Sequence, residues 1–311
     1  MLGKEWYYLF FYLLIFPGFL FTAVLGSLAA VMDRKVSARF QYRVGPPWHQ
    51  SFTDFFKLLG KETVLIRNTL TPVYIAAPLA ALASVILASS LIGAAAFLRL
   101  DLAGDILFYV YLLLIFTVCL ILGAFASGNV YAGQGAQREI NLLLAYELPF
   151  FLSILIPVVK TGFTLKMSEF VAWQTGHGAI VASFSGAIGF LTAVLCIQAK
   201  MGLTPFDVAE AETELAGGIL MEYSGPLLGF WKLAHNMLYA VLPLTVAVLF
   251  LGGVFAPPYW IGFLKYLGVV VLMIIIRNTN PRLKIDGILR FFWKPLSVAA
   301  LAGVILALLG Y

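Results

Sequence analysis

The chain consists of long apolar runs separated by shorter polar segments. Each run is about 20 residues long, the length that an α-helix needs to cross the hydrocarbon core of a bilayer. Because the apolar residues are continuous and do not alternate with polar ones, the pattern favours helices over the strands of a membrane barrel. We therefore predict eight membrane-spanning helices, at residues 6–31, 72–97, 105–127, 140–159, 179–200, 227–252, 258–276 and 289–310.

The polar segment after the first span, Met32–Leu70, is unusually long and basic. Part of it has apolar residues on one side of a helix and charged residues on the other. The apolar side holds Phe52, Phe55, Phe56, Leu59 and Ile66, and the charged side holds Asp54, Lys57 and Lys61. This pattern is typical of an amphipathic helix that lies in the membrane interface. Such a helix would form either the wall of a cavity or partner platform, or a simple anchor.

Composition agrees with a membrane protein. Of the 311 residues, 62% are hydrophobic and 11% are charged, and the mean hydropathy is +0.97. Soluble domains carry roughly 25% charged residues, so a soluble globule is excluded. The first apolar stretch reads as a retained helix and not as a cleavable signal. No linker divides the chain, and we expect one all-α polytopic membrane domain, residues 1–311.

The distribution of Lys and Arg predicts the orientation of the chain. Fourteen of these residues follow odd-numbered spans, and only Lys4, Arg99, Lys160 and Lys166 follow even-numbered ones or precede the first. Since cytoplasmic loops carry the excess of positive charge, the odd loops are expected in the cytoplasm and both termini outside. The protein is therefore expected to be a multi-pass protein of the cell membrane, with its polar motifs on the cytoplasmic side.

A cluster of carboxylates lies between two of the spans, in the segment Pro205–Gly225, which reads PFDVAEAETELAGGILMEYSG. Carboxylates are costly near lipid, so such a cluster requires a reason. If Val208–Ala216 were helical, three of the acids would lie within roughly a 60° arc, and like charges that close tend to share protons. The acids are Asp207, Glu210, Glu212, Glu214 and Glu222. The segment is either a proton relay, an acidic docking surface or a solvated loop. Ion pairs with the basic loops would neutralise part of its charge.

Glu147 is the most informative single residue, because it lies inside the fourth span with no charged neighbour in sequence. An ionisable residue within the membrane indicates a functional site, here a group that holds and releases a proton. The structural alternative is a carboxyl group that forms hydrogen bonds between helices. Glu139 lies eight residues earlier, near the interface and on a neighbouring face, so a path between the two would need water.

Lys232 and His235 are weaker candidates, three residues apart near the start of the sixth span, where they could extend a polar path. No histidine has the spacing of a metal site, and Cys119 and Cys196 each lie alone in an apolar run, typical of packing residues. Phosphate-binding loops, a dinucleotide fingerprint and hydrolytic nucleophiles are all absent from the sequence. We therefore expect no metal and no catalytic residue in this chain, and redox chemistry in a partner.

The motifs resemble those of a known family. The block from Pro205 to Gly225 resembles the signature of the H-type membrane subunit of respiratory complex I, the NADH dehydrogenase subunit 1 family. Three further blocks are similar in order along the chain: Arg34–Pro46, Ala145–Glu147 and Arg277–Lys294. The resemblance covers essentially the whole chain, and the acidic block is its most specific part.

One departure bears on the electron acceptor. The run Gly45–Gln50 is shorter than in complex I, and with the run GAQREINLLLAYELP it is more similar to the equivalent subunit of energy-converting membrane-bound [NiFe] hydrogenases, sulfur reductases and formate hydrogenlyases. Those relatives pass electrons to protons or sulfur compounds and need no quinone. The resemblance leaves the acceptor open, and also whether H⁺ or Na⁺ is moved.

The resemblance implies a non-catalytic subunit of an ion-pumping oxidoreductase. Glu139, Glu147 and the acidic block would connect the redox arm to ion-translocating subunits, and basic residues would dock that arm. The docking residues would be Arg34, Arg39, Arg43, Arg277, Arg282, Lys284 and Arg290. Iron–sulfur clusters and a [NiFe] centre would belong to peripheral partner subunits. Antiporter-like membrane subunits and lipid would be the other partners, with no nucleic acid.

Three other interpretations remain. A quinone-binding H-type subunit of a NADH- or ferredoxin-dependent oxidoreductase would be recognised by bound quinone or by inhibition at a quinone site. A stand-alone secondary transporter is disfavoured by the lack of an inverted repeat, and transport by the purified chain would support it. A purely structural anchor would lose assembly but not coupling when its acidic block is neutralised.

Overall fold

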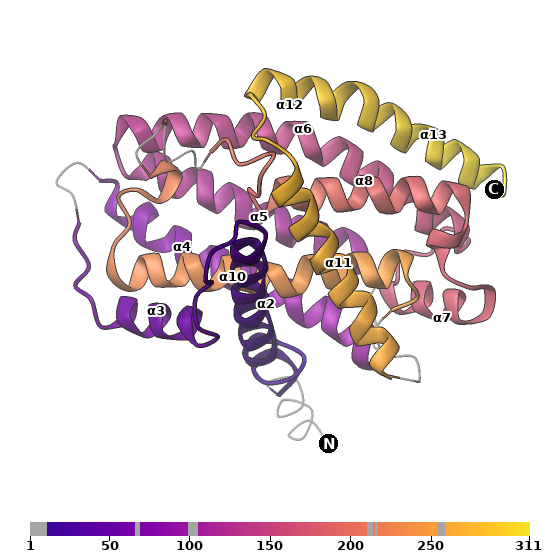
Figure 1. The fold of residues 1–311 in the computed structure, drawn as a ribbon, viewed down its shortest axis with the longest axis horizontal. Coiled ribbons are helices and arrows are strands. Elements are labelled where there is room, and N and C mark those ends of the chain that lie inside the picture. The colour runs from indigo at the N-terminus through magenta and orange to yellow at the C-terminus, as the bar shows by residue number, and fades with distance from the viewer. Residues whose placement is uncertain (1–10, 66–68, 99–104, 210–213, 215–216, 254–258) are drawn as a thin grey trace.

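A computed structural model describes residues 11–65, 69–98, 105–209, 214, 217–253 and 259–311, and these residues contain helices and no strand (Figure 1). The longer helices are α2 (Phe19–Phe40), α3 (Gln50–Leu59), α4 (Thr71–Gly93), α5 (Asp105–Ala126), α6 (Val130–Lys160), α7 (Met167–His177), α8 (Phe184–Lys200), α10 (Gly225–Phe250), α11 (Tyr259–Thr279), α12 (Ile285–Phe291) and α13 (Ser297–Leu308). Short helical turns lie at Ala94–Leu98, Ile180–Ala182, Gly218–Leu220 and Phe292–Leu296.

The described part of the chain contains 7 helices that are long and apolar enough to cross a membrane, and α8 is a shorter apolar helix. The long ones are Phe11–Phe40, Thr71–Leu98, Ile106–Ala126, Val130–Lys160, Gly225–Phe250, Trp260–Thr279 and Ile285–Leu308. Each of the eight predicted spans falls on one of these helices. The prediction of an all-α polytopic membrane protein is therefore confirmed.

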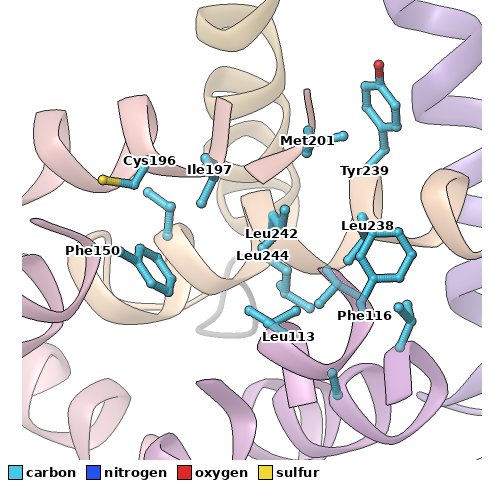
Figure 2. Close-up of a cluster of buried hydrophobic side chains, with 14 of the residues drawn as sticks. Leu113, Phe116, Phe150, Cys196, Ile197, Met201, Leu238, Tyr239, Leu242 and Leu244 are labelled. Atoms are coloured by element: carbon cyan, nitrogen blue, oxygen red, sulfur yellow. The ribbon is translucent and has the colours of Figure 1, made fainter. Parts of the chain in front are cut away.

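Helix α10 forms the centre of the structure. From Met237 to Phe250 its residues are apolar on all sides except for Thr245, as expected for a helix with neighbours on every side, and all of them are buried. Figure 2 shows Leu238, Leu242 and Leu244 of α10 among side chains from α5, α6 and α8, such as Leu113 and Phe150. These contacts hold α5, α6 and α8 around α10 through a continuous apolar core.

Helices α2 and α11 run across the direction of most other helices (Figure 1). Both pack against α10 and against each other. At the crossing of α2 with α10, a Cβ atom on Gly26 would overlap the backbone carbonyl of Asn236. Only glycine permits the two backbones to come this close. The contact brings the C-terminal half of α2 next to α10, where several of the candidate residues lie.

The ends of two helices differ from the predicted spans. Helix α2 continues to Phe40, past the predicted end at residue 31, because no Gly or Pro interrupts the polar stretch before Gly45. Helix α6 begins at Val130, ten residues before the predicted start at residue 140, and its first turn is capped by Asn129, whose side chain accepts from the backbone N–H of Tyr131. Arg34, Arg39 and Glu139 are therefore helical residues.

The amphipathic helix expected in the first loop is α3, which packs against α10 through Phe55 and Leu58, next to Gly229. Phe56 is exposed, as expected for a side chain facing lipid or a partner. The helix ends at Leu59, so Lys61 lies beyond it, and Ile66 lies outside the described residues. A second short helix, α7, follows the fourth span and was not predicted.

Candidate functional site

Glu147 forms a buried ion pair with Lys200. The Lys200 ammonium lies 2.8 Å from Glu147 Oε1, and the side chains of Lys200 and Glu147 are only 2% and 14% exposed. The ammonium also lies over the rings of Tyr146 and Phe150, at 5.0 and 5.3 Å from their centroids. The second carboxylate oxygen, Oε2, is buried and has no hydrogen-bond partner among the described residues. Glu147 is thus paired on one side and open to another partner on the other.

The cation beside Glu147 was not expected from the sequence, where Lys200 was counted only as one of the basic residues that follow odd-numbered spans. It is the last residue of α8, and Glu147 lies in the middle of α6, so the pair joins two neighbouring helices. Taking two charges out of water costs several kcal/mol for each ion, and an ion pair repays this only in part. A pair at this position therefore needs a reason beyond stability.

Glu139 lies two turns before Glu147 on α6 and is buried. Tyr146 is fully buried on the same helix and lies in the electrostatic field of both carboxylates. Its hydroxyl is 3.4 Å from the hydroxyl of Thr117 on α5. Helix α6 therefore carries Glu139 and Glu147, and the buried Tyr146 lies between them in the sequence.

A second ion pair joins α2 to α11, where Arg277 donates to Asp33 Oδ2. Tyr239 of α10 donates its hydroxyl to the same oxygen over 3.1 Å, and in Figure 2 this hydroxyl points away from the apolar cluster. The Asp33 side chain is 2% exposed, and its Oδ1 has no partner within the described chain. Asp33 was not among the predicted site residues, because the first span was predicted to end at residue 31. The lack of any Gly or Pro between that residue and Gly45 could have indicated that the helix continues through Asp33.

A cavity of about 560 Å³ lies beside this pair. Its wall is apolar in part, with Phe116, Leu120 and Trp231, and charged in part. The ionisable side chains that line it are Asp33, Arg34, Asp54, Asp207, Lys232, His235, Arg277 and Arg282. The cavity therefore brings together residues of the first loop, the acidic block and the last loop, which are far apart in sequence.

Lys232 and His235, the two weaker candidates, both line this cavity from the first turns of α10. The His235 ring is half-buried and meets the ring of Tyr239 edge to face, with centroids 5.7 Å apart. Lys232 is exposed. Both residues therefore share this cavity with Asp33, whereas Glu147 is not among the residues that line it.

The acidic block forms ion pairs with basic residues of two other segments. Asp207 accepts from Arg282 over 2.5 Å, and its second oxygen is buried without a partner among the described residues. Glu214 accepts from Arg138 over 2.6 Å. Glu210 and Glu212 lie outside the described residues, and Val208 and Ala209 are not helical, so the predicted helix does not begin at Val208. The expected ion pairing with a basic loop is present for Asp207, whereas Arg138, the partner of Glu214, belongs to α6 and to neither basic loop.

Glu222, the last acid of the block, accepts a hydrogen bond from the side chain of Asn129, the cap of α6. Two tyrosines hold the backbone beside it. Tyr74 of α4 donates to the Glu222 carbonyl over 2.7 Å, and Tyr223 donates to the Tyr74 carbonyl over 3.1 Å, with the two rings stacked at 4.1 Å. Burial raises the pKa of the Tyr223 hydroxyl, which therefore stays a neutral donor. Glu222 is thereby fixed at the junction of α4 and α6.

The seven predicted docking residues divide into two groups. Three are engaged within the chain: Arg277 with Asp33, Arg282 with Asp207, and Arg34 with Ser51 at 2.6 Å and Asp54 at 4.0 Å. The other four are exposed and form no ion pair within the described part of the chain: Arg39, Arg43, Lys284 and Arg290. This second group therefore leaves its charges on the surface of the described chain.

Within the described residues, no three or more His, Cys, Asp or Glu side chains are placed to hold a metal ion. Cys119 and Cys196 are buried and not joined to each other. The ionisable side chains described above are held instead in ion pairs between helices, such as Glu147 with Lys200 and Asp33 with Arg277.

Comparison with known proteins gives a consistent result. Residues 12–308 match the family model described as NADH dehydrogenase. The chain is 33% identical over 305 residues to the H subunit of the NADH-quinone oxidoreductase of Bacillus thuringiensis (strain Al Hakam), covering 92% of this chain and 90% of that protein. The corresponding protein of Anoxybacillus flavithermus is 32% identical over 303 residues, with the same shares covered.

A solved structure is also similar. A chain in the structure of the membrane-bound sulfane sulfur reductase, an archaeal respiratory membrane complex, superposes with a TM-score of 0.86 at 28% sequence identity. The alignment covers 96% of this chain and 99% of that one. The similarity therefore extends over nearly the whole fold, including the helices that carry the ion pairs.

Proposed function

The chain belongs to the NADH dehydrogenase family, as a membrane subunit of the H type, and from that premise we propose that it couples electron transfer to ion translocation. It acts within a complex I-like oxidoreductase of the sulfur reductase or membrane-bound hydrogenase type. The chain itself carries no redox centre in this proposal. Iron–sulfur clusters, and a [NiFe] centre where one is present, belong to partner subunits.

The observation that carries the proposal is the buried pair of Glu147 and Lys200, with one carboxylate oxygen left without a partner among the described residues. A carboxylate and an ammonium of this burial are expensive, and residues of this kind within membranes mark ion pathways. Protonation of Glu147 would release Lys200 from its partner, and loss of the proton would restore the pair. The site therefore has two charge states. In one, the ion pair holds α6 and α8 together, and in the other, the protonated Glu147 no longer binds Lys200 as an ion pair.

The path of the signal follows the charged residues of the cavity. Reduction or protonation at the docked arm changes the electrostatic potential at the cavity, where Asp33 and Arg277 lie. That change is passed through the acidic block, including Asp207 and Glu214, to Glu147. Coupling of this kind is a free energy shared between two sites, so ion release at Glu147 would in turn act on the redox arm.

Docking of the peripheral arm is assigned to the exposed cations Arg39, Arg43, Lys284 and Arg290. Their long side chains are free of ion pairs within the described chain, and complementary charge steers protein association. We infer a cytoplasmic position for these residues from the excess of Lys and Arg on their side of the membrane. Ion-translocating, antiporter-like subunits would bind elsewhere in the membrane plane.

A quinone-binding role is the second candidate, because the cavity combines an apolar wall with polar groups and because the relatives in Bacillus are named NADH-quinone oxidoreductases. The purified complex would then reduce a short-chain quinone at a rate that depends on cavity residues. We expect Leu120→Trp, which fills part of the cavity, to leave electron transfer unchanged in a sulfur reductase or hydrogenase. A loss of quinone reduction in this variant would favour the second candidate.

The test of the main proposal is Glu147→Gln in the intact complex, reconstituted in vesicles. We expect the ions moved per electron to fall to background for both H⁺, followed with a pH dye, and Na⁺, followed with a radioactive tracer. Assembly and electron transfer should persist. Glu169→Gln is the control, since Glu169 is an exposed carboxylate on α7, paired with Lys166 at 3.0 Å. A wild-type ratio in Glu147→Gln would show that the relay is wrong.

The two remaining interpretations predict different results. A stand-alone transporter would move ions when the chain is purified without its partners, whereas we expect no transport by the chain alone. A structural anchor would lose assembly, and not the ratio of ions to electrons, when Asp207 and Glu214 are both changed to their amides.

A further inference from the structure

Gln198 is close in sequence or by hydrogen bond to one residue of each buried ion pair, because it lies two residues before Lys200 and donates to Met273, four residues before Arg277. It is fully buried in the last turn of α8, two residues before Lys200. Successive positions of a helix point in different directions, so Lys200 reaches α6 while Gln198 reaches α11. In Figure 1, α8 runs beside α6 and meets α11, in agreement with the contacts between these helices.

The Gln198 amide donates to two backbone carbonyl groups on different elements. Its Nε2 lies 2.9 Å from the oxygen of Thr204, in the segment after α8, and 3.4 Å from the oxygen of Met273, in α11. The backbone carbonyl of Gln198 accepts from Leu203 over 3.1 Å as well. One side chain thus fixes the start of the acidic segment against α11.

Further hydrogen bonds continue this connection toward the charged residues. Thr204 donates its hydroxyl to the carbonyl of Arg277 over 2.9 Å, which ties the segment to the residue that binds Asp33. Pro205 accepts from the backbone N–H of Leu283 over 3.0 Å, one residue after Arg282, the partner of Asp207. These bonds join the segment 203–207 to Arg277 and to the neighbour of Arg282, the two arginines of the last loop that form ion pairs.

We propose that Gln198 is a positioning residue that couples the Asp33–Arg277 pair to the Glu147–Lys200 pair, by holding the end of α8, the segment 203–207 and the end of α11 as one unit. The proposal rests on the proposed function, because it assumes that charge at the first pair affects the second. Gln198 itself neither carries a charge nor exchanges a proton. By holding these elements together, Gln198 would make a movement of α11 at Arg277 also move the end of α8 at Lys200. Without Gln198, the segment 203–207 could change conformation and leave Lys200 in place.

The test is Gln198→Leu in the intact complex, which keeps a side chain of similar size and removes both donated bonds. We expect electron transfer to continue while the ions moved per electron fall about twofold or more, the scale on which residues between coupled sites change their coupling. Gln174→Leu is the matched control. Gln174 is also a buried glutamine that donates to a carbonyl of another helix, that of Val248 at 3.0 Å, but it lies on α7, away from both ion pairs.

Thr204 provides a second, smaller test of the same connection, for use also if Gln198→Leu fails to assemble. Thr204→Val removes the hydroxyl and should lower the ratio, whereas Thr204→Ser retains the hydroxyl and should restore it. A wild-type ratio in both Gln198→Leu and Thr204→Val overturns the proposal, as does an equal fall in Gln174→Leu.

The proposed function is tested separately by Glu147→Gln in the same preparation. If that variant loses ion transport while Gln198→Leu and Thr204→Val both keep the full ratio, only the positioning role is wrong. If Glu147→Gln keeps the wild-type ratio, there is no relay at this site, and the positioning role falls together with the proposed function.

Discussion

The ammonium of Lys200 lies 2.8 Å from the carboxylate of Glu147, in a contact between α8 and α6 that is almost closed to solvent. The two residues are 53 positions apart in sequence. Each is costly where it lies, and each reduces the cost of the other. Their effects on stability should therefore be strongly non-additive.

Lys200→Met should lower the free energy of unfolding by about 3–5 kcal/mol, because it leaves a buried carboxylate without its cation. The double variant Glu147→Gln with Lys200→Met should regain most of that loss. Thermal unfolding of the purified complex, followed for the four members of the cycle, measures the interaction.

Lys166→Met serves as the control for this cycle. Lys166 and Glu169 form an ion pair at 3.0 Å with side chains 51% and 47% exposed, so its removal should change stability by only about 0–1 kcal/mol. Equal effects of Lys166→Met and Lys200→Met would contradict the assignment of a buried, energetically important pair.

Asp33→Asn should weaken the junction of α2 and α11. The change keeps the shape of the side chain and removes the charge that Arg277 and Tyr239 bind. Because the Arg277 side chain is 32% exposed and retains contact with water, we expect a loss of about 1.5–3 kcal/mol, the value of hydrogen bonds to a charged group.

Tyr239→Phe removes one hydrogen bond to the charged Asp33 and should cost about 1.5–3 kcal/mol. Since both residues act on the same oxygen, the double variant should lose less than the sum of the two single changes. Additive losses, measured as shifts in the thermal midpoint, would mean that the two residues act independently.

The orientation of the chain can be tested with single cysteines, because Cys119 and Cys196 are buried and should give little background labelling. Tyr311→Cys, at the exposed C-terminus, should react with a membrane-impermeant maleimide in intact spheroplasts. Tyr42→Cys, in the fully exposed turn after α2, should react only after permeabilisation. The reverse order of labelling would place the motif-bearing loops outside the cell.

Much of the fold could be predicted from the sequence, because the length of an apolar run determines whether it spans a membrane. The ends of the helices could not. Hydropathy marks the part of a helix that lies in lipid, whereas α2 and α6 continue as polar helix to Phe40 and back to Val130. The polar ends are held by hydrogen bonds, such as that of Asn129, which apolar patterns do not record.

The types of residue in the candidate site could be predicted from the sequence, but most of their ion-pair partners could not. A lone carboxylate in an apolar span drew attention to Glu147, whose role as a relay stays a prediction. The opposite charges of the acidic block and the last loop indicated ion pairs, and Asp207 with Arg282 is one. The partner of Glu147 depends on how α6 and α8 pack, which a single sequence does not specify. For the same reason Asp33 was not recognised as the anion that binds Arg277.

The close crossing of α2 and α10 gives a prediction that connects packing to function. A methyl group on Gly26 would overlap the carbonyl of Asn236 and lie 2.9 Å from Cα of Met237, both backbone atoms that cannot turn aside. Gly26→Ala should therefore force the helices apart and cost about 1–3 kcal/mol or more. Because α2 carries Asp33 and α10 carries Tyr239, the same change should also weaken their hydrogen bond.

Gly268→Ala is the matched control, since Gly268 lies within α11 and a Cβ atom there meets nothing within 4 Å. Alanine is the better helix former by about 0.5–1 kcal/mol, so this variant should be as stable as the wild type or more so. The thermal midpoint and the yield of assembled complex measure both effects. A wild-type midpoint for Gly26→Ala would mean that the two helices can separate without cost, and that their contact does not fix Asp33 against Tyr239.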